Sequence, residues 1–342
     1  MAKAGPRNLI TDVAGIKVGN AQDMDVRTGV TVVLCDEPTV AVVDSRGGAP
    51  GTRETDALKP ECLVGGVDAL FLSGGSVYGL DAGSGIMAWL AAQGRGYQIA
   101  TSPVKAPITP GAILFDLMNE GDKGWGMNPP YRDLGIAACE AAGLDFALGT
   151  QGAGTGAVAG QLKGGLGSAS VISSAGYTVG ALIAANPIGS TLVAGTDKFW
   201  AAPFELNREF GGKGVATTTA MAGMPPDTKR GPDGAEDAPH DMRGNTTIGI
   251  VATDAALTQV QAQRLAIMAQ DGLARAIRPA HTPFDGDTLF VLATAKKAVD
   301  EPMGTLLDIG ALAADCVARA TARAVYEATS LGASASYQDM FG

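Results

Sequence analysis

Short runs of apolar, β-branched residues predict strands along much of the chain. Residues 29–34 and 40–44 are two such runs, and the turn sequence Asp-Glu-Pro-Thr between them predicts a hairpin. Residues 157–163 and 168–173 bracket a Gly-Gly-Leu-Gly sequence and predict a second hairpin. Both hairpins are expected to belong to antiparallel sheet.

Three further apolar runs predict buried strands, at residues 177–185, 246–253 and 288–294. The stretch 164–196 carries no Asp, Glu, Lys or Arg, which is typical of strands in a sheet covered on both faces. Ser, Asn and Pro residues interrupt this stretch, and the chain has no apolar run of about 18 residues or more. We therefore expect buried strands here and no transmembrane span.

Helical spacing of apolar residues occurs in three places. Residues 76–93 carry such residues on one side, although three glycines lower the helix propensity. Thr258, with Gln261 three residues later, predicts a capping box before a helix that runs to about residue 277, with Val260 on its inner side. A last helix is expected over residues 306–330. Strands precede and separate these helices, which predicts a layered α/β domain.

Residues 211–245 differ in composition from the rest of the chain. They are rich in Gly, Pro, Asp and Lys and include the sequences Met-Pro-Pro-Asp and Arg-Gly-Pro-Asp-Gly. Because this segment has little apolar material to bury, we expect a mobile linker. It ends abruptly at the apolar strand predicted from residue 246.

Composition narrows the class of protein. The 342 residues include 48 Gly and 2 His, and the formal net charge of -10 argues against nucleic acid or an anionic membrane as partner. The basic residues near the N-terminus are not followed by an apolar segment, so a cytoplasmic location is expected. The Cys residues form no C-x-x-C pair and neither His lies near one, so we expect free thiols and no metal site.

Standard catalytic motifs are missing from the sequence, which contains no G-x-S-x-G, H-E-x-x-H or Walker A pattern. Residues 102–105 fit S-x-x-K, but Pro107 and Pro110 oppose the helix that this motif needs. Residues 152–157 fit G-x-G-x-x-A and leave a nucleotide-binding oxidoreductase as an alternative. Against it, the first acid after Gly152 is Asp197, and a strand is predicted directly after the glycines.

The junction between Asn245 and Thr246 carries the most specific chemistry. A linker delivers a Thr to the first position of a buried strand, which is the arrangement an N-terminal nucleophile hydrolase needs, although ordinary loops also end this way. In such an enzyme the Thr246 hydroxyl attacks the Asn245 carbonyl, the ester hydrolyses, and the new α-amine serves as the base. Neither His240 nor His281 has to act, and His281, which lies close to Asp285, is a candidate neighbour of the site.

Sequence blocks that span nearly the whole chain are characteristic of one family. They comprise residues 8–19 with 27–31, residues 72–80, the glycine segment 152–167, and residues 248–254. Together they resemble the DmpA-type aminopeptidase family of N-terminal nucleophile hydrolases. Gly-Asn-Thr-Thr at 244–247 and Asp-Gly-Asp-Thr-Leu-Phe at 285–290 are most similar to its nylon-oligomer (6-aminohexanoate oligomer) hydrolase branch, since aminopeptidase branches usually carry Ser as the nucleophile.

The resemblance implies a four-layer αββα sandwich and assigns roles to individual residues. The matching catalytic positions are the nucleophile Thr246, the oxyanion donor Asn186, an active-site lysine at Lys163, and the acidic pair Asp285 and Asp287. Phe115 stands where nylon-type relatives have Tyr, and we expect Phe115 and Tyr78 to contact the substrate.

The sequence thus predicts a single αββα domain that cuts itself between Asn245 and Thr246 into chains 1–245 and 246–342. It would hydrolyse amide bonds of peptides or linear oligoamides through an acyl-enzyme on Thr246, with no cofactor and no metal. The resemblance also implies a homo-oligomer, a tetramer of these two-chain units. An aminopeptidase for D- or β-amino acid N-termini stays open as an alternative.

Overall fold

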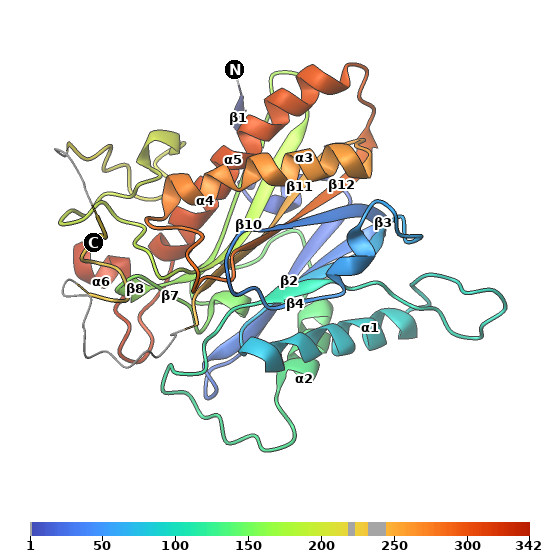
Figure 1. The fold of residues 1–342 in the computed structure, drawn as a ribbon, viewed down its shortest axis with the longest axis horizontal. Coiled ribbons are helices and arrows are strands. Elements are labelled where there is room, and N and C mark those ends of the chain that lie inside the picture. Colours follow the sequence, from blue (N-terminus) through green and yellow to red (C-terminus); the bar gives the residue numbers. More distant parts are fainter. Residues whose placement is uncertain (1, 218–222, 232–243) are drawn as a thin grey trace.

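Two stacked sheets with helices on either side make up the computed structural model, which describes residues 2–217, 223–231 and 244–342 (Figure 1). The strands are β1 (Lys3–Ala4), β2 (Ile16–Asp23), β3 (Thr28–Ser45), β4 (Thr52–Arg53), β5 (Val67–Ser73), β6 (Gly111–Ile113), β7 (Val158–Ala159), β8 (Leu162–Lys163), β9 (Gly165–Ile172), β10 (Thr178–Asn186), β11 (Thr246–Ala255) and β12 (Thr288–Lys297). The helices are α1 (Ala82–Ala92), α2 (Tyr131–Glu140), α3 (Gln259–Ala269), α4 (Asp271–Ala276), α5 (Pro302–Tyr326) and α6 (Tyr337–Phe341).

Strand β3 belongs to both sheets. Residues 28–35 pair with β2, residues 30–34 and Thr39 pair with β5, and residues 40–45 pair with β12. The register shifts between Leu34 and Thr39, where the strand passes from one sheet to the other. The predicted hairpin over residues 29–44 is therefore wrong: its polar turn sequence interrupts the pairing but does not reverse the chain.

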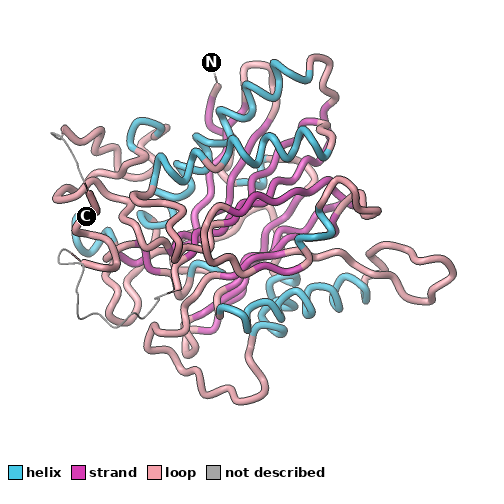
Figure 2. The backbone as a smooth tube through the Cα atoms, in the orientation of Figure 1, coloured by secondary structure: helices cyan, strands magenta, loops and turns pink. Residues whose placement is uncertain are grey.

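The helices are divided between the outer faces of the two sheets. One sheet runs in the order β1-β9-β10-β11-β12-β3, and the other contains β2, β3, β5, β6 and β4. Helices α3, α4 and α5 cover the first sheet, and α1 and α2 cover the second (Figures 1 and 2). The predicted αββα order of layers is confirmed.

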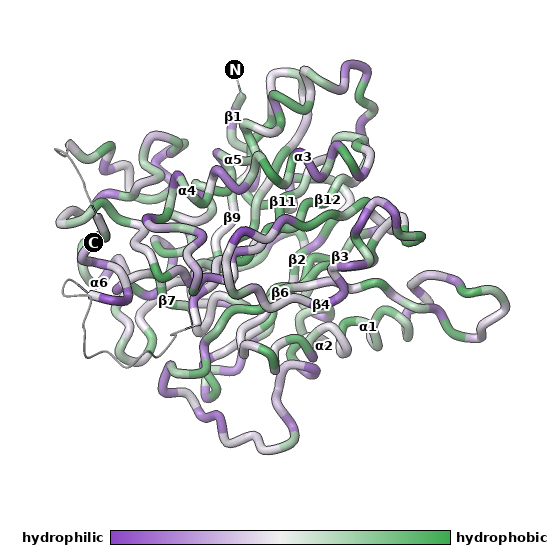
Figure 3. Tube along the Cα trace, in the orientation of Figure 1, coloured by the Kyte–Doolittle hydropathy of each residue, from purple (hydrophilic) through white to green (hydrophobic). Residues whose placement is uncertain are grey.

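Buried side chains on alternating faces of the central strands hold these layers together. Leu182, Ile250 and Phe290 belong to the core between the two sheets. Their strand neighbours Ile183 and Val251 face the other way and pack in the core beneath α3, α4 and α5. A third core lies between the second sheet and helices α1 and α2. Strands covered on both faces are apolar at successive positions, which explains the continuous hydrophobic runs along them (Figure 3).

Gly165 and Gly167 lie inside strand β9 and not in a turn. A Cβ on Gly167 would come within 2.0 Å of the Ala320 carbonyl oxygen, and one on Gly165 within 2.3 Å of the Ala324 oxygen. These glycines therefore let α5 approach the sheet closely. The predicted hairpin over residues 157–173 is wrong for this reason, and the antiparallel pair is formed earlier, by β7 and β8.

Most helix predictions are confirmed, with differences in detail. The segment predicted at 76–93 begins as a 3₁₀ helix, Ser76–Asp81, before α1. The predicted capping box is present, with Gln261 N donating to Thr258 Oγ1 at 3.3 Å. Val260, however, is exposed and does not lie on the inner side of the helix. The single helix predicted up to residue 277 is divided into α3 and α4. Helix α2 was not predicted. Among the described helices none is both long enough and apolar enough to cross a membrane.

Candidate active site

Thr246 and Asn186 face each other at the ends of two neighbouring strands. They are the paired residues that close the antiparallel ladder between β10 and β11. Alternation along the strands places both side chains on the same face as Leu182 and Ile250, toward the space between the sheets. Both residues are buried. The predicted nucleophile and the predicted oxyanion donor are thus brought together by strand register.

The carbonyl group of Asn245 accepts two hydrogen bonds. One comes from the hydroxyl of Thr246, the next residue. The other comes from the backbone N–H of Gly286, at 2.9 Å. A Cβ on Gly286 would lie 2.7 Å from Thr246 Oγ1, so the approach of this backbone depends on glycine. No sequence pattern indicated Gly286, because a backbone donor leaves no side-chain signal.

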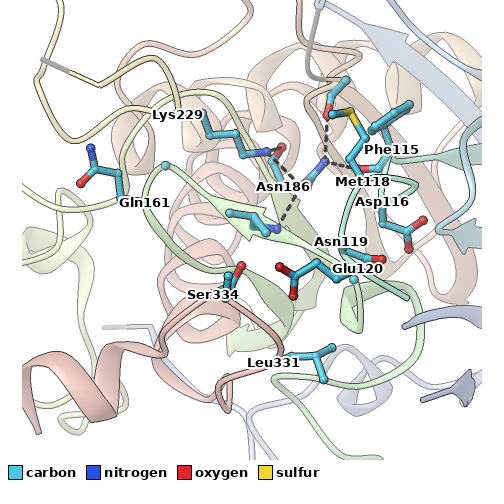
Figure 4. Close-up of a pocket in the computed structure, with 15 residues that line it drawn as sticks. Phe115, Asp116, Met118, Asn119, Glu120, Gln161, Asn186, Lys229, Leu331 and Ser334 are labelled. Carbon is cyan, nitrogen blue, oxygen red and sulfur yellow. Dashed lines mark hydrogen bonds between the residues drawn. The ribbon is translucent and has the colours of Figure 1, made fainter. Parts of the chain in front are cut away.

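The amide group of Asn186 is oriented by four neighbours (Figure 4). Its Nδ2 donates to the carbonyl oxygens of Phe115 at 3.1 Å and Gly244 at 3.5 Å. Its Oδ1 accepts from the Val158 N–H and from Lys229 Nζ, both at 3.0 Å. The donor face of the amide is therefore directed at the residue before Asn245.

Asp287 connects strand β11, which begins at the predicted nucleophile, to the loop before β12. Its Oδ1 accepts from Thr247 N at 2.8 Å, directly after the predicted nucleophile. Its Oδ2 accepts from His281 N at 3.0 Å and lies 2.9 Å from His281 Nδ1. His281, a candidate neighbour of the site from the sequence, thus contacts Asp287 directly, one member of the buried acidic pair.

Asp285 is fully buried on the other side of Gly286. Its carboxylate accepts from the backbone N–H groups of Ile188 and Thr282, each at 3.1 Å. Burial and the nearby charge of Asp287 raise the pKa of Asp285 above its ordinary value. Asp285 and Asp287 therefore flank the residue that donates to the Asn245 carbonyl, close to the predicted nucleophile.

Lys163 is buried beside the glycine segment. Its Nζ donates to the carbonyl oxygens of Gly154, Ala157 and Gly164 at 3.0, 2.8 and 2.7 Å. Burial lowers the pKa of Lys163 to about 7, and the carboxylate of Asp116 partly offsets this. In its ammonium form, Lys163 donates its three N–H groups to these carbonyls and so fixes the backbone that borders the site.

A cavity of about 510 Å³ opens beside Asn186 and Gly244. Its lining residues are Phe115, Asp116, Met118, Asn119, Glu120, Gly156, Val158, Gly160, Gln161, Asn186, Lys229, Gly244, Leu331, Ala333 and Ser334. The structure brings Phe115 to this cavity but not Tyr78, which is half exposed and packs edge-on against Trp125 at 5.6 Å between ring centroids.

Part of the predicted linker contributes to this cavity. Residues 223–231 are described, and within them Thr228 is fully buried and Lys229 contacts Asn186. The rest of the segment 218–243, including His240, lies outside the described residues. No local sequence pattern indicated Lys229, because 43 positions separate it from Asn186.

The fold is that of the N-terminal nucleophile hydrolases. The L-aminopeptidase D-Ala-esterase/amidase of Ochrobactrum anthropi, described as a new variant of that fold, is similar with a TM-score of 0.68 and 21% identity, over 96% of this chain and 88% of that chain. Residues 8–338 match the model of Peptidase family S58, and the chain belongs to this family. It is a hydrolase of amide bonds, as the sequence predicted.

Two relatives of this chain carry names for different activities. An uncharacterized aminopeptidase of Mycobacterium bovis is 45% identical, over 98% of this chain and 98% of that protein. The 6-aminohexanoate-oligomer endohydrolase of a Kocuria species is 28% identical, over 85% of this chain and 76% of that protein. The family assignment replaces the nucleotide-binding oxidoreductase alternative, and residues 152–157 lead into strand β7 and not into a helix.

Proposed function

We propose that this protein is a self-processing amide hydrolase that uses Thr246 as its nucleophile. The observation that carries the proposal is the position of the Thr246 hydroxyl against the Asn245 carbonyl oxygen, which also accepts from Gly286 N at 2.9 Å. A nucleophile and a donor to the developing oxyanion thus meet at one peptide bond. Cleavage there gives chains 1–245 and 246–342.

The self-cleavage is an acyl shift followed by hydrolysis. Thr246 Oγ1 adds to the carbonyl carbon of Asn245, the C–N bond breaks, and the hydroxyl proton ends on the nitrogen of Thr246. Water then hydrolyses the ester, which leaves a carboxylate on Asn245 and a free α-amine on Thr246. Asp285 and Asp287, both buried beside this point, supply negative charge that favours the new ammonium group.

The cleaved enzyme acts on substrates through the same hydroxyl. The α-amine of Thr246 accepts the hydroxyl proton as Oγ1 attacks the substrate carbonyl, and the proton passes to the leaving amine. The side-chain amide of Asn186 donates to the oxyanion. Water resolves the acyl-enzyme and regenerates Thr246. Each step uses groups of this chain and water.

We propose peptides or linear oligoamides as substrates. The cavity beside Asn186 offers apolar side chains, Phe115, Met118 and Leu331 among them, together with polar groups. The names of the relatives, an aminopeptidase and a 6-aminohexanoate-oligomer endohydrolase, agree with this substrate class. We also propose a homo-oligomer, a tetramer of the two-chain units, which light scattering of the purified protein would test.

An aminopeptidase that takes D- or β-amino acid N-termini is a second candidate. The 45% identity to an aminopeptidase favours it. The cavity wall includes two acidic side chains, Asp116 and Glu120, the residue type that a substrate ammonium group requires, and Glu120 also pairs with Arg27 at 3.2 Å. Paired substrates with free and acetylated N-termini separate the candidates, because only an aminopeptidase requires the free amine.

Denaturing electrophoresis and mass spectrometry of the purified protein test the nucleophile. We expect two chains that meet at Asn245 and Thr246 in the wild type, one uncut chain in Thr246→Ala, and slower cutting in Thr246→Ser. Hydrolysis of alanine p-nitroanilide and of a linear 6-aminohexanoate trimer should be lost in Thr246→Ala. A variant that is cut or remains active without this hydroxyl would contradict the proposal.

A further inference from the structure

A segment that precedes the proposed cleavage point is fastened beside the active site. Lys229 N donates to the Ile188 carbonyl at 3.0 Å, just after the end of β10. Two residues earlier, Asp227 Oδ2 accepts from Ser190 Oγ at 2.5 Å. Thr228 between them is fully buried. These contacts set the position from which the Lys229 side chain reaches the site.

The ammonium group of Lys229 ends on Asn186. Its Nζ donates to Asn186 Oδ1 at 3.0 Å and to the Asn186 carbonyl oxygen at 3.1 Å (Figure 4). The Val158 N–H donates to the same Oδ1. A flipped amide would turn its NH2 group toward both of these donors, so the pair holds the oxygen in place. The NH2 group must then point toward Gly244 and the cavity.

We propose that Lys229 is a positioning residue for substrate hydrolysis, which fixes the Asn186 amide as the oxyanion donor. The inference rests on the proposed function of this site. A cation on Oδ1 also polarises the amide, so its N–H groups become stronger donors. Nδ2 donates one hydrogen to Phe115 O at 3.1 Å. Its second hydrogen, which makes only the longer 3.5 Å contact from Nδ2 to Gly244 O, serves the substrate.

Self-cleavage and substrate hydrolysis are expected to depend on Lys229 differently. The carbonyl broken in self-cleavage is that of Asn245, whose donor is Gly286 N and not the Asn186 amide. Removing the Lys229 cation should therefore leave self-cleavage unchanged while it slows turnover. A residue needed only for folding would impair both processes.

The test compares purified, self-processed wild type with Lys229→Met, Lys229→Arg, Asn186→Ala and the double variant Lys229→Met/Asn186→Ala. Lys296→Met, which removes a surface ion pair with Glu37, is the matched control. Cleavage is followed by denaturing electrophoresis. Values of kcat and KM are measured with whichever of alanine p-nitroanilide and the 6-aminohexanoate trimer the wild type hydrolyses faster.

For Lys229→Met we expect complete self-cleavage, KM within about twofold, and kcat lower by roughly 10- to 100-fold, less than the ~10²–10³ typical of deleting an oxyanion donor. Lys229→Arg should recover part of the loss. In the Asn186→Ala background the Lys229→Met change should have no further effect, since it acts through that amide. If Lys229→Met does not fold, Lys229→Arg, Asn186→Ala and the double variant Lys229→Arg/Asn186→Ala form the cycle instead, and the smaller effect of Lys229→Arg on kcat should likewise vanish in the Asn186→Ala background.

An unchanged kcat, an effect confined to KM, or full additivity with Asn186→Ala would overturn the role of Lys229. These outcomes differ from a failure of the proposed function, in which the wild type itself stays uncut or Thr246→Ala remains active.

Discussion

The backbone N–H of Gly286 donates to the carbonyl oxygen of Asn245 at 2.9 Å. Because the Thr246 hydroxyl donates to the same oxygen, this contact places a donor where negative charge would develop in the proposed self-cleavage. A parallel β-bridge between Asn245 and Asp285 brings Gly286 there, and Asp287 on its other side accepts a hydrogen bond from Thr247 N.

Replacing Gly286 by alanine should slow self-cleavage by ~10²–10³, the usual effect of losing an oxyanion donor. The added Cβ would meet Ala49 O at 2.6 Å and Thr246 Oγ1 at 2.7 Å, so both the loop and the nucleophile must shift. The rate is measured by electrophoresis after purification of freshly made precursor. Gly65→Ala is the control, since nothing lies within 4 Å of a Cβ there, and cutting of Gly286→Ala at the wild-type rate would exclude this donor role.

Asp287→Ala should lower the free energy of unfolding by about 1–3 kcal/mol, because the buried N–H of Thr247 loses its acceptor. Urea unfolding in a Thr246→Ala background measures this on single uncut chains. The control is Asp56→Ala, an exposed acid paired with Lys59, which should change stability by less than about 0.5 kcal/mol. Equal effects of the two substitutions would argue against a structural role for Asp287.

Glu209 should bind the two chains together after cleavage. Its side chain is 5% exposed and pairs with Arg319 of α5, with Oε1 at 2.5 Å from Nε and Oε2 at 3.0 Å from Nη2. Glu209→Gln leaves a buried guanidinium without a charge partner, and we expect a loss of about 3–5 kcal/mol in urea unfolding. Asp36→Asn, which breaks a half-exposed pair with Lys17, should cost about 0–1 kcal/mol. If Glu209→Gln and Asp36→Asn lower the free energy of unfolding by the same small amount, Glu209 does not hold the two chains together.

Lys163 should make stability rise with pH above neutrality. Its pKa is about 7 in the folded protein and 10.5 ordinarily, so between these values the unfolded chain binds more protons than the folded one. The advantage of the wild type over Lys163→Met should therefore grow between pH 7 and pH 9, by at most about 1.4 kcal/mol per pH unit. Urea unfolding at several pH values checks this, again on uncut chains. A constant difference would mean that the three carbonyl groups keep the ammonium form.

Secondary structure followed from the sequence wherever neighbours along the chain decide it. The strand predictions at 177–185, 246–253 and 288–294 are confirmed as β10, β11 and β12, and so is the capping box at Thr258. Periodicity and capping are local properties, since they depend on residues a few positions apart. Contacts between segments far apart in the chain could not be predicted from such local patterns. That is why β3 was expected to be a hairpin and Gly167 a turn residue.

For the active site, sequence blocks across the chain indicated the family, and the motif around Thr246 with the Asp-Gly-Asp sequence predicted the branch and the proposed chemistry without coordinates. The sequence by itself determined which residue types carry that chemistry. Only the tertiary structure decided their relations: the register that sets Thr246 against Asn186, the backbone donor at Gly286, and the reach of Lys229 to the Asn186 amide. These relations arise from strand pairing and packing between segments far apart in the chain, and such contacts leave no pattern in the local sequence.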